Sequence, residues 1–349
     1  MINNSFFSTE ILRWFRENGR DLPWRETKDP YAIWLSEIIL QQTRIVQGWE
    51  YWERFMQTYP KVEDLAAASE DDVLKLWQGL GYYSRARNLH AAAKQIVALG
   101  SFPNTLDGIK SLKGVGDYTA AAIGSFAFDI PAAVVDGNVY RVLSRYFGID
   151  TPINSTQGKK EFAALAQSLL PASDAASYNQ GMMDFGAIQC TPQSPKCLLC
   201  PLAETCEALR SGRVEELPVK NKTVKVKTRH LSYIYIRCKS SVADGSGIPE
   251  PMVAIHRRGE GDIWQGLWEP YNVSDVKELP SFVKNPILLA KDVKHVLTHR
   301  ILLADFYLLE TETCPQLPDD YIWIKESEIE DYGVPRLIEI MLEKINPAE

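Results

Sequence analysis

Two acidic residues have sequence surroundings that could suit them to a chemical role. The first is Glu37, in the stretch WLSEIILQQT (residues 34–43). Asp29 and Pro30 give a helix start signal, and no Gly or Pro interrupts the stretch, which predicts a helix. The residues one helical turn away from Glu37 are mostly apolar: Ile33, Trp34, Leu40 and Gln41. A carboxyl group in such surroundings needs an explanation.

Two interpretations of Glu37 are open. It could border a polar edge with Gln41 and extend into water, as most glutamates do. Alternatively, it is a partly desolvated carboxyl group, whose pKa rises because burial disfavours the charged form. Such a group holds a proton at neutral pH and can act as a general acid. The helix alone favours the solvated interpretation.

The second acid, Asp136, ends an apolar run and opens a helix in AAVVDGNVYRVLSRYFG (residues 132–148). It is equally well interpreted as a helix N-cap or as a second carboxylate, kept ionised by backbone N–H groups and facing the first. Cleavage of a glycosidic bond requires two carboxyl groups of unlike pKa. One donates a proton, and the other stabilises the developing oxocarbenium cation.

Four of the six cysteines lie in one short segment, with the spacing Cys-x6-Cys-x2-Cys-x5-Cys. They are Cys190, Cys197, Cys200 and Cys206. Interspersed prolines keep the backbone out of helix, so the thiolates can converge on zinc or on an iron–sulfur cluster. Three short, unequal spacings favour a 4Fe–4S cluster over the two separated pairs of most zinc sites. Cys238 and Cys314 stand apart, and we interpret them as ordinary strand or loop residues.

The composition is that of a soluble globular protein of two domains: 349 residues, 45% hydrophobic and 24% charged. No apolar run is long enough to span a membrane, and the N-terminus lacks the pattern of a signal or transit peptide. We therefore expect an intracellular protein. The net charge of −7 argues against a nucleic-acid partner, but local patches decide binding. One basic segment is equally consistent with a solvated linker and with phosphate contact: Lys220, Lys222, Lys225, Lys227 and Arg229.

The organisation of the chain changes after that basic segment. Residues 1–212 carry helical apolar spacing, and we expect an all-α domain that includes the cysteine loop. Residues 213–230 form the expected linker. Residues 231–349 combine strand patterns, such as LSYIYIRCK and RILLADFYLLE, with a closing helix in VPRLIEIMLEKI, and predict a smaller α+β domain. Within the first domain, SLKGVGDYTAAAIGSFAF predicts a helix, a tight turn at Gly114 and Gly116, and a second helix. That turn suits either an anion such as a DNA phosphate or a plain corner.

Several motifs together resemble the MutY-type adenine DNA glycosylases of the endonuclease III superfamily. LKGVGDYTAAAI is similar to a helix–hairpin–helix DNA-binding motif, and VDGNVYRVLSR follows it. The cysteine spacing is similar to the iron–sulfur loop of that superfamily. The stretches LPWR, SEIILQQT, GLGYYSRARNL and MMDFGAIQCTP are similar to those of MutY-type enzymes, so the resemblance covers almost the whole chain.

The resemblance implies removal of adenine mispaired with 8-oxoguanine or guanine in double-stranded DNA, by a monomer of a prokaryotic cytoplasm that acts at the nucleoid. It implies that Glu37 protonates N7 of the flipped adenine and that Asp136 stabilises the cationic sugar. Bifunctional members carry a lysine two residues after the second hairpin glycine, where this chain has Tyr118, which cannot form an imine. A monofunctional hydrolase is therefore expected, with Tyr118 and Asn138 lining the catalytic site.

Other contacts follow from the same resemblance. Arg20, Leu22, Trp24 and Arg25 are expected in the adenine pocket. Tyr82 is expected to wedge into the base stack and offset the cost of extruding a base, with Gln41, Gln42, Thr43 and Leu80 near the lesion.

The C-terminal domain resembles the Nudix-like 8-oxoguanine-recognition module of the family, through GDIWQGLWEPYNV. It lacks the glutamate-rich helix of a Nudix hydrolase and is expected to bind without hydrolysing. The family's Phe-Ser-His triplet is Leu297-Thr298-His299 here, which keeps a hydroxyl and an imidazole but not the aromatic ring.

Two alternatives remain at this stage. The first is an endonuclease III-like glycosylase and lyase that acts on oxidised pyrimidines, which Tyr118 and the extra domain disfavour. The second is a non-catalytic, redox-active DNA-binding module, which would not need Glu37 and Asp136.

Overall fold

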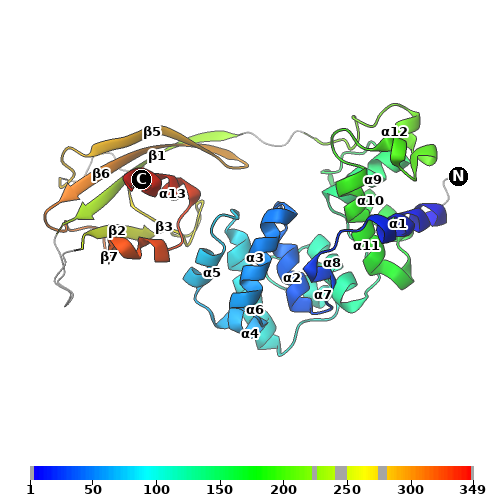
Figure 1. Cartoon of the computed structure of the whole chain (residues 1–349), viewed down its shortest axis with the longest axis horizontal. Coiled ribbons are helices and arrows are strands. Elements are labelled where there is room, and N and C mark those ends of the chain that lie inside the picture. Colours follow the sequence, from blue (N-terminus) through cyan, green and yellow to red (C-terminus); the bar gives the residue numbers. More distant parts are fainter. Residues whose placement is uncertain (1–3, 222–225, 240–249, 274–280, 347–349) are drawn as a thin grey trace. The chain divides into compact units, whose positions relative to one another are not determined.

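The computed structural model describes residues 4–221, 226–239, 250–273 and 281–346 (Figure 1). The chain divides into two compact units, which we call the first unit (residues 1–66 and 91–222) and the second unit (residues 67–90 and 223–349). Residues 67–90 thus group with the C-terminal part of the chain, although their sequence pattern is helical. The expected domain boundaries at residues 212 and 230 remain a prediction. No helix in the described ranges is long and apolar enough to cross a membrane.

Helices build the first unit, as the apolar spacing predicts. They pack around two clusters of buried side chains, one between α1, α9, α10 and α11 and one between α2 and α8. The elements of residues 4–67 and 106–210 are α1 (Asn4–Asn18), η1 (Pro23–Arg25), α2 (Pro30–Ile39), α3 (Ile45–Thr58), α4 (Val62–Ala67), α7 (Leu106–Lys110), α8 (Asp117–Phe128), α9 (Gly137–Phe147), α10 (Thr156–Leu169), η2 (Ala172–Asp174), α11 (Ala175–Asp184), η3 (Phe185–Gln189), η4 (Cys197–Leu199), η5 (Ala203–Thr205) and α12 (Glu207–Arg210).

Helix α2 begins as predicted but ends earlier. The side chain of Asp29 accepts a hydrogen bond from the backbone N–H of Tyr31, and Pro30 occupies the first helical position. The helix ends at Ile39, because Gln42 adopts a left-handed φ of +59° that an α-helix cannot contain. The prediction of a helix through residue 43 is therefore wrong at its end, and Gln41, Gln42 and Thr43 lie in a turn.

The predicted helix–turn–helix is confirmed. The side chain of Thr105 caps α7, and α8 begins at Asp117. Gly114 has a φ of +78°, which a residue with a Cβ rarely adopts, so glycine is required at this corner. Gly116 is the N-cap of α8, and a Cβ at this position would meet no atom within 4 Å. The amino end of α8 is therefore open to an approaching group.

A seven-stranded sheet forms the core of the second unit. Its main path is β3-β2-β1-β6-β5, with β4 pairing with β1 and β7 pairing with β2. Only the β1–β6 pair is parallel among the described strand pairs. The unit comprises α5 (Glu70–Leu76), the start of α6 (Ser84–Leu99), β1 (Lys227–Cys238), β2 (Met252–Arg257), β3 (Trp268–Glu269), β4 (Tyr271–Asn272), β5 (Ile287–Val296), β6 (Arg300–Thr311), β7 (Tyr321–Lys325), η6 (Glu326–Asp331) and α13 (Arg336–Ile345).

Alternate residues of β1 face opposite sides of this sheet. Leu231, Tyr233 and Tyr235 pack in one cluster with Leu337 and Met341 of α13, so the helix covers that face. The intervening side chains of β1 belong to a second cluster on the other face. The turn between β5 and β6 joins two neighbouring antiparallel strands of this sheet.

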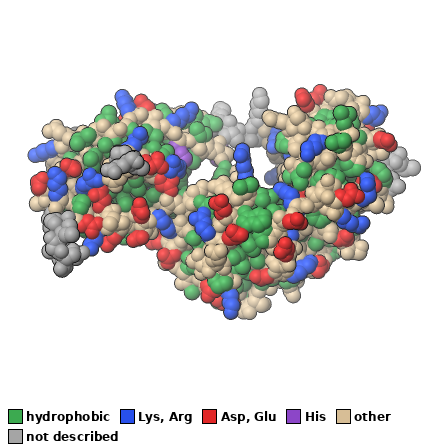
Figure 2. All heavy atoms as spheres, in the orientation of Figure 1, with side chains coloured by type: hydrophobic (Ala, Val, Ile, Leu, Met, Phe, Trp, Pro, Cys, Tyr) green, Lys and Arg blue, Asp and Glu red, His purple; other side chains and the backbone are tan. Residues whose placement is uncertain are grey.

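The basic segment is partly absorbed into structure. β1 begins at Lys227, so the last residues of the expected linker are strand. The guanidinium of Arg229 donates to Asp262 at 2.6 Å, an intramolecular partner that competes with phosphate contact. Lys222 and Lys225 lie outside the described residues. Figure 2 shows acidic and basic side chains interspersed over the visible face, in agreement with the small net charge.

Candidate active site and metal centre

Glu37 lies in the wall of a partly enclosed cavity in the first unit. The side chain is 6% exposed, so the solvated interpretation is wrong. The hydroxyl of Tyr118, on the first turn of α8, donates a hydrogen bond to Oε2 of Glu37 at 2.8 Å. All four residues expected around an adenine also line the cavity: Arg20, Leu22, Trp24 and Arg25. The structure therefore gathers them around one carboxyl group.

The surroundings of Glu37 favour its protonated form. Burial raises its pKa to about 7, and the negative charge of Asp136 contributes in the same direction. The hydrogen bond from Tyr118 and the positive charge of Arg25 act in the opposite direction but do not outweigh burial. A substantial fraction of the chains thus carries a proton on Glu37 at neutral pH, as a general acid requires.

Asp136 is both an N-cap and a neighbour of Glu37, so the two interpretations of its sequence are compatible. Its carboxylate accepts hydrogen bonds from the backbone N–H of Val139 at 2.8 Å and from the amide of Asn138 at 2.7 Å. Burial nevertheless raises the pKa of Asp136 above its ordinary value, although these hydrogen bonds lower it. These hydrogen bonds favour the ionised form of Asp136, as expected, but burial has the larger effect on its pKa.

Helix α9 connects the Asp136 end to the cysteine loop. Arg141 is buried and donates to the amide oxygen of Asn138 at 2.9 Å, to the carbonyl of Gly186 at 2.6 Å and to the carbonyl of Cys190 at 2.7 Å. A Cβ on Gly186 would lie only 2.6 Å from the Cβ of Asn138, so η3 approaches α9 closely at this glycine. Asn138 is thus held between Asp136 and Arg141.

The side chains of Arg20 and Arg25 are bound from behind by Asp184, the last residue of α11. Asp184 is 0% exposed and forms ion pairs with both arginines. Burial alone would raise its pKa, but hydrogen bonds from Arg25 and Arg20 hold the pKa of Asp184 below its ordinary value. The cavity wall therefore contains two guanidinium groups with one fixed counter-charge.

The other expected DNA-facing residues of the first unit lie in the turn after α2 and in the hairpin. The amide of Gln41 donates to the hydroxyl of Thr119 on α8 at 3.2 Å, which ties that turn to the hairpin helix. Gln42 is exposed, and Thr43 is partly exposed. Gly114 and Gly116 occupy the corner between α7 and α8 described above.

The remaining expected residues belong to the second unit. Thr298 and His299 form a two-residue turn between β5 and β6, in which the N–H of Leu297 donates to the carbonyl of Arg300 at 2.8 Å. Tyr82 is 47% exposed, has a φ of +47° and shares a hydrogen bond of 2.6 Å with the hydroxyl of Thr298. Tyr82 and Thr298 line the same groove. Leu80, two residues before Tyr82 in the sequence, is buried.

An acidic hub holds the base of this turn. Asp262 accepts hydrogen bonds from Arg229, Arg258 and Arg300 at 2.6, 2.7 and 3.1 Å. Burial by itself would raise the pKa of Asp262, but the hydrogen bonds from Arg229 and from the backbone N–H of Ile263, with the charges of Arg229 and Arg258, lower it to about 2, so the carboxylate remains charged at neutral pH. Arg300 directly follows the turn, so its hydrogen bond to Asp262 holds the turn that carries Thr298 and His299.

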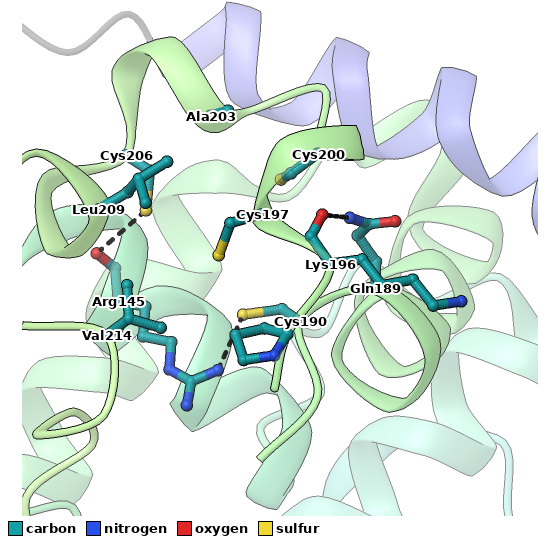
Figure 3. A pocket seen from close by; sticks show the side chains of 11 residues that line it. Arg145, Gln189, Cys190, Lys196, Cys197, Cys200, Ala203, Cys206, Leu209 and Val214 are labelled. Atoms are coloured by element: carbon teal, nitrogen blue, oxygen red, sulfur yellow. Dashed lines mark hydrogen bonds between the residues drawn. The ribbon is translucent and has the colours of Figure 1, made fainter. Parts of the chain in front are cut away.

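The four clustered cysteines line a second cavity of the first unit. Figure 3 shows their sulfur atoms pointing toward a common space. A guanidinium N–H of Arg145 donates to Sγ of Cys190 at 3.5 Å, and other N–H groups of Arg145 donate to the carbonyls of Thr191 and Pro192. Four converging thiols with a nearby cation fit a thiolate-bound metal centre. Cys190, Cys197, Cys200 and Cys206 would be its ligands.

Replacing one of these ligands tests the assignment. We expect Cys200→Ser to lower the bound iron and acid-labile sulfide and the visible absorption of the purified protein, because a serine hydroxyl replaces a cluster thiolate. The exposed Cys314 provides the matched control, and Cys314→Ser should keep the full iron content. Zinc in a colourless wild-type protein would contradict the iron–sulfur assignment.

Sequence reasoning missed several residues of the active-site cavity. Ser36, Leu40, Ile45, Phe126, Gln180 and Met183 line it. Asp184 had a usable signal, because it is an acid in the apolar stretch MMDFGAIQC, as Glu37 is in its own helix. Arg141 and Arg145 had no comparable signal, since arginines on a helix are normally solvated.

Family models match three segments of the chain. Residues 35–171 match the HhH-GPD superfamily base excision DNA repair protein, residues 190–206 match the iron-sulfur binding domain of endonuclease III, and residues 249–344 match the NUDIX domain. The last two agree with the 4Fe–4S and Nudix-like expectations.

Relatives and solved structures agree with these matches. An adenine DNA glycosylase of Buchnera aphidicola subsp. Schizaphis graminum is 31% identical over 97% of this chain and 98% of its own length. An adenine DNA glycosylase of Mus musculus is 42% identical over 61% of this chain but only 44% of its own length. The structure of a thermostable thymine-DNA glycosylase covers 60% of this chain and 97% of its own, with a TM-score of 0.56 and 34% identity.

A trapped endonuclease III–DNA covalent intermediate shares the fold of the same part, with a TM-score of 0.53 at 22% identity over 61% of this chain and 99% of its own. The fold, the buried acid, the cysteine loop and a full-length relative together place this chain in the adenine DNA glycosylase family, within the HhH-GPD superfamily of base excision DNA repair proteins.

Proposed function

We propose that this protein is a monofunctional glycosylase that hydrolyses the N-glycosidic bond of adenine paired with 8-oxoguanine or guanine in duplex DNA. The observation that carries the proposal is the burial of Glu37 in a cavity whose surroundings raise the pKa of its carboxyl group to about 7. The family supplies the substrate class, and the site supplies the chemistry.

The cavity suggests a sequence of steps. An extruded adenine enters the cavity, and protonated Glu37 transfers its proton to N7, so that the base can leave as neutral adenine. The glycosidic bond breaks, and the electron pair goes to the base. The carboxylate of Asp136, positioned by Asn138, stabilises the sugar cation. Water then adds to C1′ and passes a proton to the carboxylate of Glu37, which leaves an abasic site and restores the acid.

Tyr118 supports hydrolysis without strand cleavage. A lyase needs an amine that forms an imine with the sugar, and the phenol of Tyr118 cannot do this. Its hydroxyl is also engaged, because it donates to Glu37 at 2.8 Å. We therefore assign Tyr118 to holding the acid, and the product should be an intact strand with an abasic site.

The second unit is proposed to recognise the base opposite the adenine. Thr298 offers a hydroxyl and His299 an imidazole on an exposed turn, and Tyr82 offers an aromatic ring to the same groove. A site that hydrogen-bonds a specific base edge discriminates against bases that lack the matching group. We propose that the domain binds 8-oxoguanine and does not hydrolyse nucleotides. The protein would act as a monomer on the DNA of a prokaryotic cytoplasm.

A glycosylase assay tests this proposal. We expect adenine release from labelled duplexes with adenine opposite 8-oxoguanine or guanine, and strand breaks only after alkali, because no imine forms. Duplexes with adenine opposite thymine, and with thymine opposite guanine, serve as substrate controls. Glu37→Gln, which keeps the shape but cannot supply a proton, should abolish release while DNA binding persists.

Different outcomes identify the alternatives. Breaks without alkali, or trapping of the enzyme on DNA by borohydride, would establish a lyase. Release of thymine but not adenine would move the assignment to the substrate of the thymine-DNA glycosylase of similar fold. Tight binding with no release from any duplex would favour the redox-active binding module.

The pH dependence of the chemical step follows from the two acids. Protonated Glu37 is the active form, and its pKa is about 7, so the single-turnover rate should fall about tenfold per pH unit well above pH 7. Asp136 must be ionised, and its pKa is raised, so the rate should also fall at acidic pH. A rate that stays constant from pH 6 to pH 9 would contradict the role of Glu37.

Removal of one hydroxyl tests the recognition turn. We expect Thr298→Ala to lower the preference for 8-oxoguanine over guanine opposite adenine by about two- to tenfold, the value of one hydrogen bond. Thr313→Ala, at an exposed threonine of the same unit, is the matched control. An unchanged ratio of the two single-turnover rates in Thr298→Ala would remove Thr298 from recognition.

A further inference from the structure

Asp184 is a buried acid that contacts two arginines of the cavity wall, and the proposed chemistry gives it no task. It accepts hydrogen bonds from the backbone N–H of Arg20 at 2.9 Å, from Nε of Arg20 at 2.9 Å and from both terminal nitrogens of Arg25 at 2.8 and 2.9 Å. A terminal nitrogen of Arg20 adds a further, short contact. A fully buried carboxylate with this many charged donors is an anchored group.

We propose that Asp184 is a positioning residue for adenine excision: it holds the guanidinium groups of Arg20 and Arg25 in the cavity wall and thereby sets how readily Glu37 keeps its proton. The inference rests on the proposed function and deepens it. Asp184 touches neither the substrate nor the reacting atoms in this assignment, and it acts through the two arginines.

The geometry explains why the arginines need this partner. Two like charges in one cavity wall repel each other, and a carboxylate between them offsets that repulsion. Arg25 is further tied down by a hydrogen bond from a terminal nitrogen to the carbonyl of Arg20 at 3.0 Å. Because Asp184 engages both terminal nitrogens of Arg25, the plane of that guanidinium is fixed.

Arg25 of this cluster acts electrostatically on Glu37. The groups that influence its carboxyl group come from different elements: Tyr118 of α8, Asp136 at the start of α9 and Arg25 of η1. The positive charge of Arg25 promotes ionisation of Glu37. Asp184 partly neutralises that charge, so its removal would leave the guanidinium groups uncompensated and make Glu37 lose its proton at a lower pH.

The test compares Asp184→Asn with the wild type, both as full-length, iron-loaded protein. Asparagine keeps the shape of the side chain and removes its charge. We expect a single-turnover rate of adenine release about a hundredfold lower, since small misplacements of positioning groups have this effect. We also expect the fall in rate at high pH, called the high-pH limb of the pH–rate profile, to move to lower pH. Binding of a duplex with a non-hydrolysable adenine nucleotide should change little. Asp184→Glu, which keeps the negative charge, should move the high-pH limb partly back to its wild-type position.

Two further variants show whether the change in the high-pH limb comes from the charge of Asp184. Arg25→Gln removes the charge that promotes ionisation of Glu37, so its high-pH limb should move in the opposite direction, to higher pH. Asp129→Asn removes an exposed acid of the same unit, ion-paired with Lys28 at 2.7 Å, and should leave the profile unchanged. A limb in Asp184→Asn that is unchanged or moves upward, with a rate loss matching only the loss of folded protein, would reduce Asp184 to a structural role.

An activity-independent readout separates this inference from the proposed function. Infrared titration of the Glu37 carboxyl, identified by difference from Glu37→Gln, should show a lower pKa in Asp184→Asn than in the wild type. If the wild type releases no adenine, the proposed function fails, and the infrared shift still decides the role of Asp184. If the wild type is active and neither readout changes in Asp184→Asn, the inference alone fails.

Discussion

The burial of one carboxyl group is the constraint on which the rest of the first unit depends. Glu37 sits on a helix whose other residues are almost all buried, so its carboxyl reaches the cavity through an apolar wall. Its pKa of about 7 against an ordinary 4.5 means that folding becomes less favourable as pH rises through that window, by about 3 kcal/mol once Glu37 is ionised in both states. Below pH 4.5 the group is protonated in both states, and this cost vanishes. Packing elsewhere must offset it, which is the usual relation between a catalytic acid and its scaffold.

Helix α9 carries much of that scaffold. Its first turn presents Asp136, and its buried face presents Arg141 and Arg145 one turn apart, both of which donate to atoms of Cys190. The cysteine loop therefore does more than enclose a cluster, because Cys190 is hydrogen-bonded to the helix that begins after Asp136, the proposed second catalytic acid. In the second unit, Asp262 plays a comparable part for the Thr298 turn. In both units a buried or half-buried ion cluster, rather than the reacting group itself, fixes the geometry.

The sequence predicted the elements well and their ends less well. Helical spacing and Pro and Gly breaks located the helices of the first unit, and the strand patterns of LSYIYIRCK and RILLADFYLLE located β1 and β6, because these signals are local. The end of α2 was misjudged, since nothing in the residues of SEIILQQT marks the left-handed backbone of Gln42. The edge strand β5 was missed because its charged residues obscure the alternation. The burial of Glu37 could be suspected from its helix, but tertiary packing decides it. No local pattern encodes the long-range contacts of the site. These are the hydrogen bond between Glu37 and Tyr118, 81 residues away, and the hydrogen bonds that Asp184 accepts from Arg20 and Arg25.

In the proposed mechanism the wild-type protein holds a proton on Glu37 near neutral pH. The direct measurement is a carbon-13 NMR titration of glutamate-labelled protein, with the Glu37 resonance assigned by its loss in Glu37→Gln. A carboxyl resonance that titrates with a pKa near 7 is the predicted result. A resonance that titrates near 4.5, the value of a solvated glutamate, would contradict the account, because the acid would then be ionised when adenine enters the cavity.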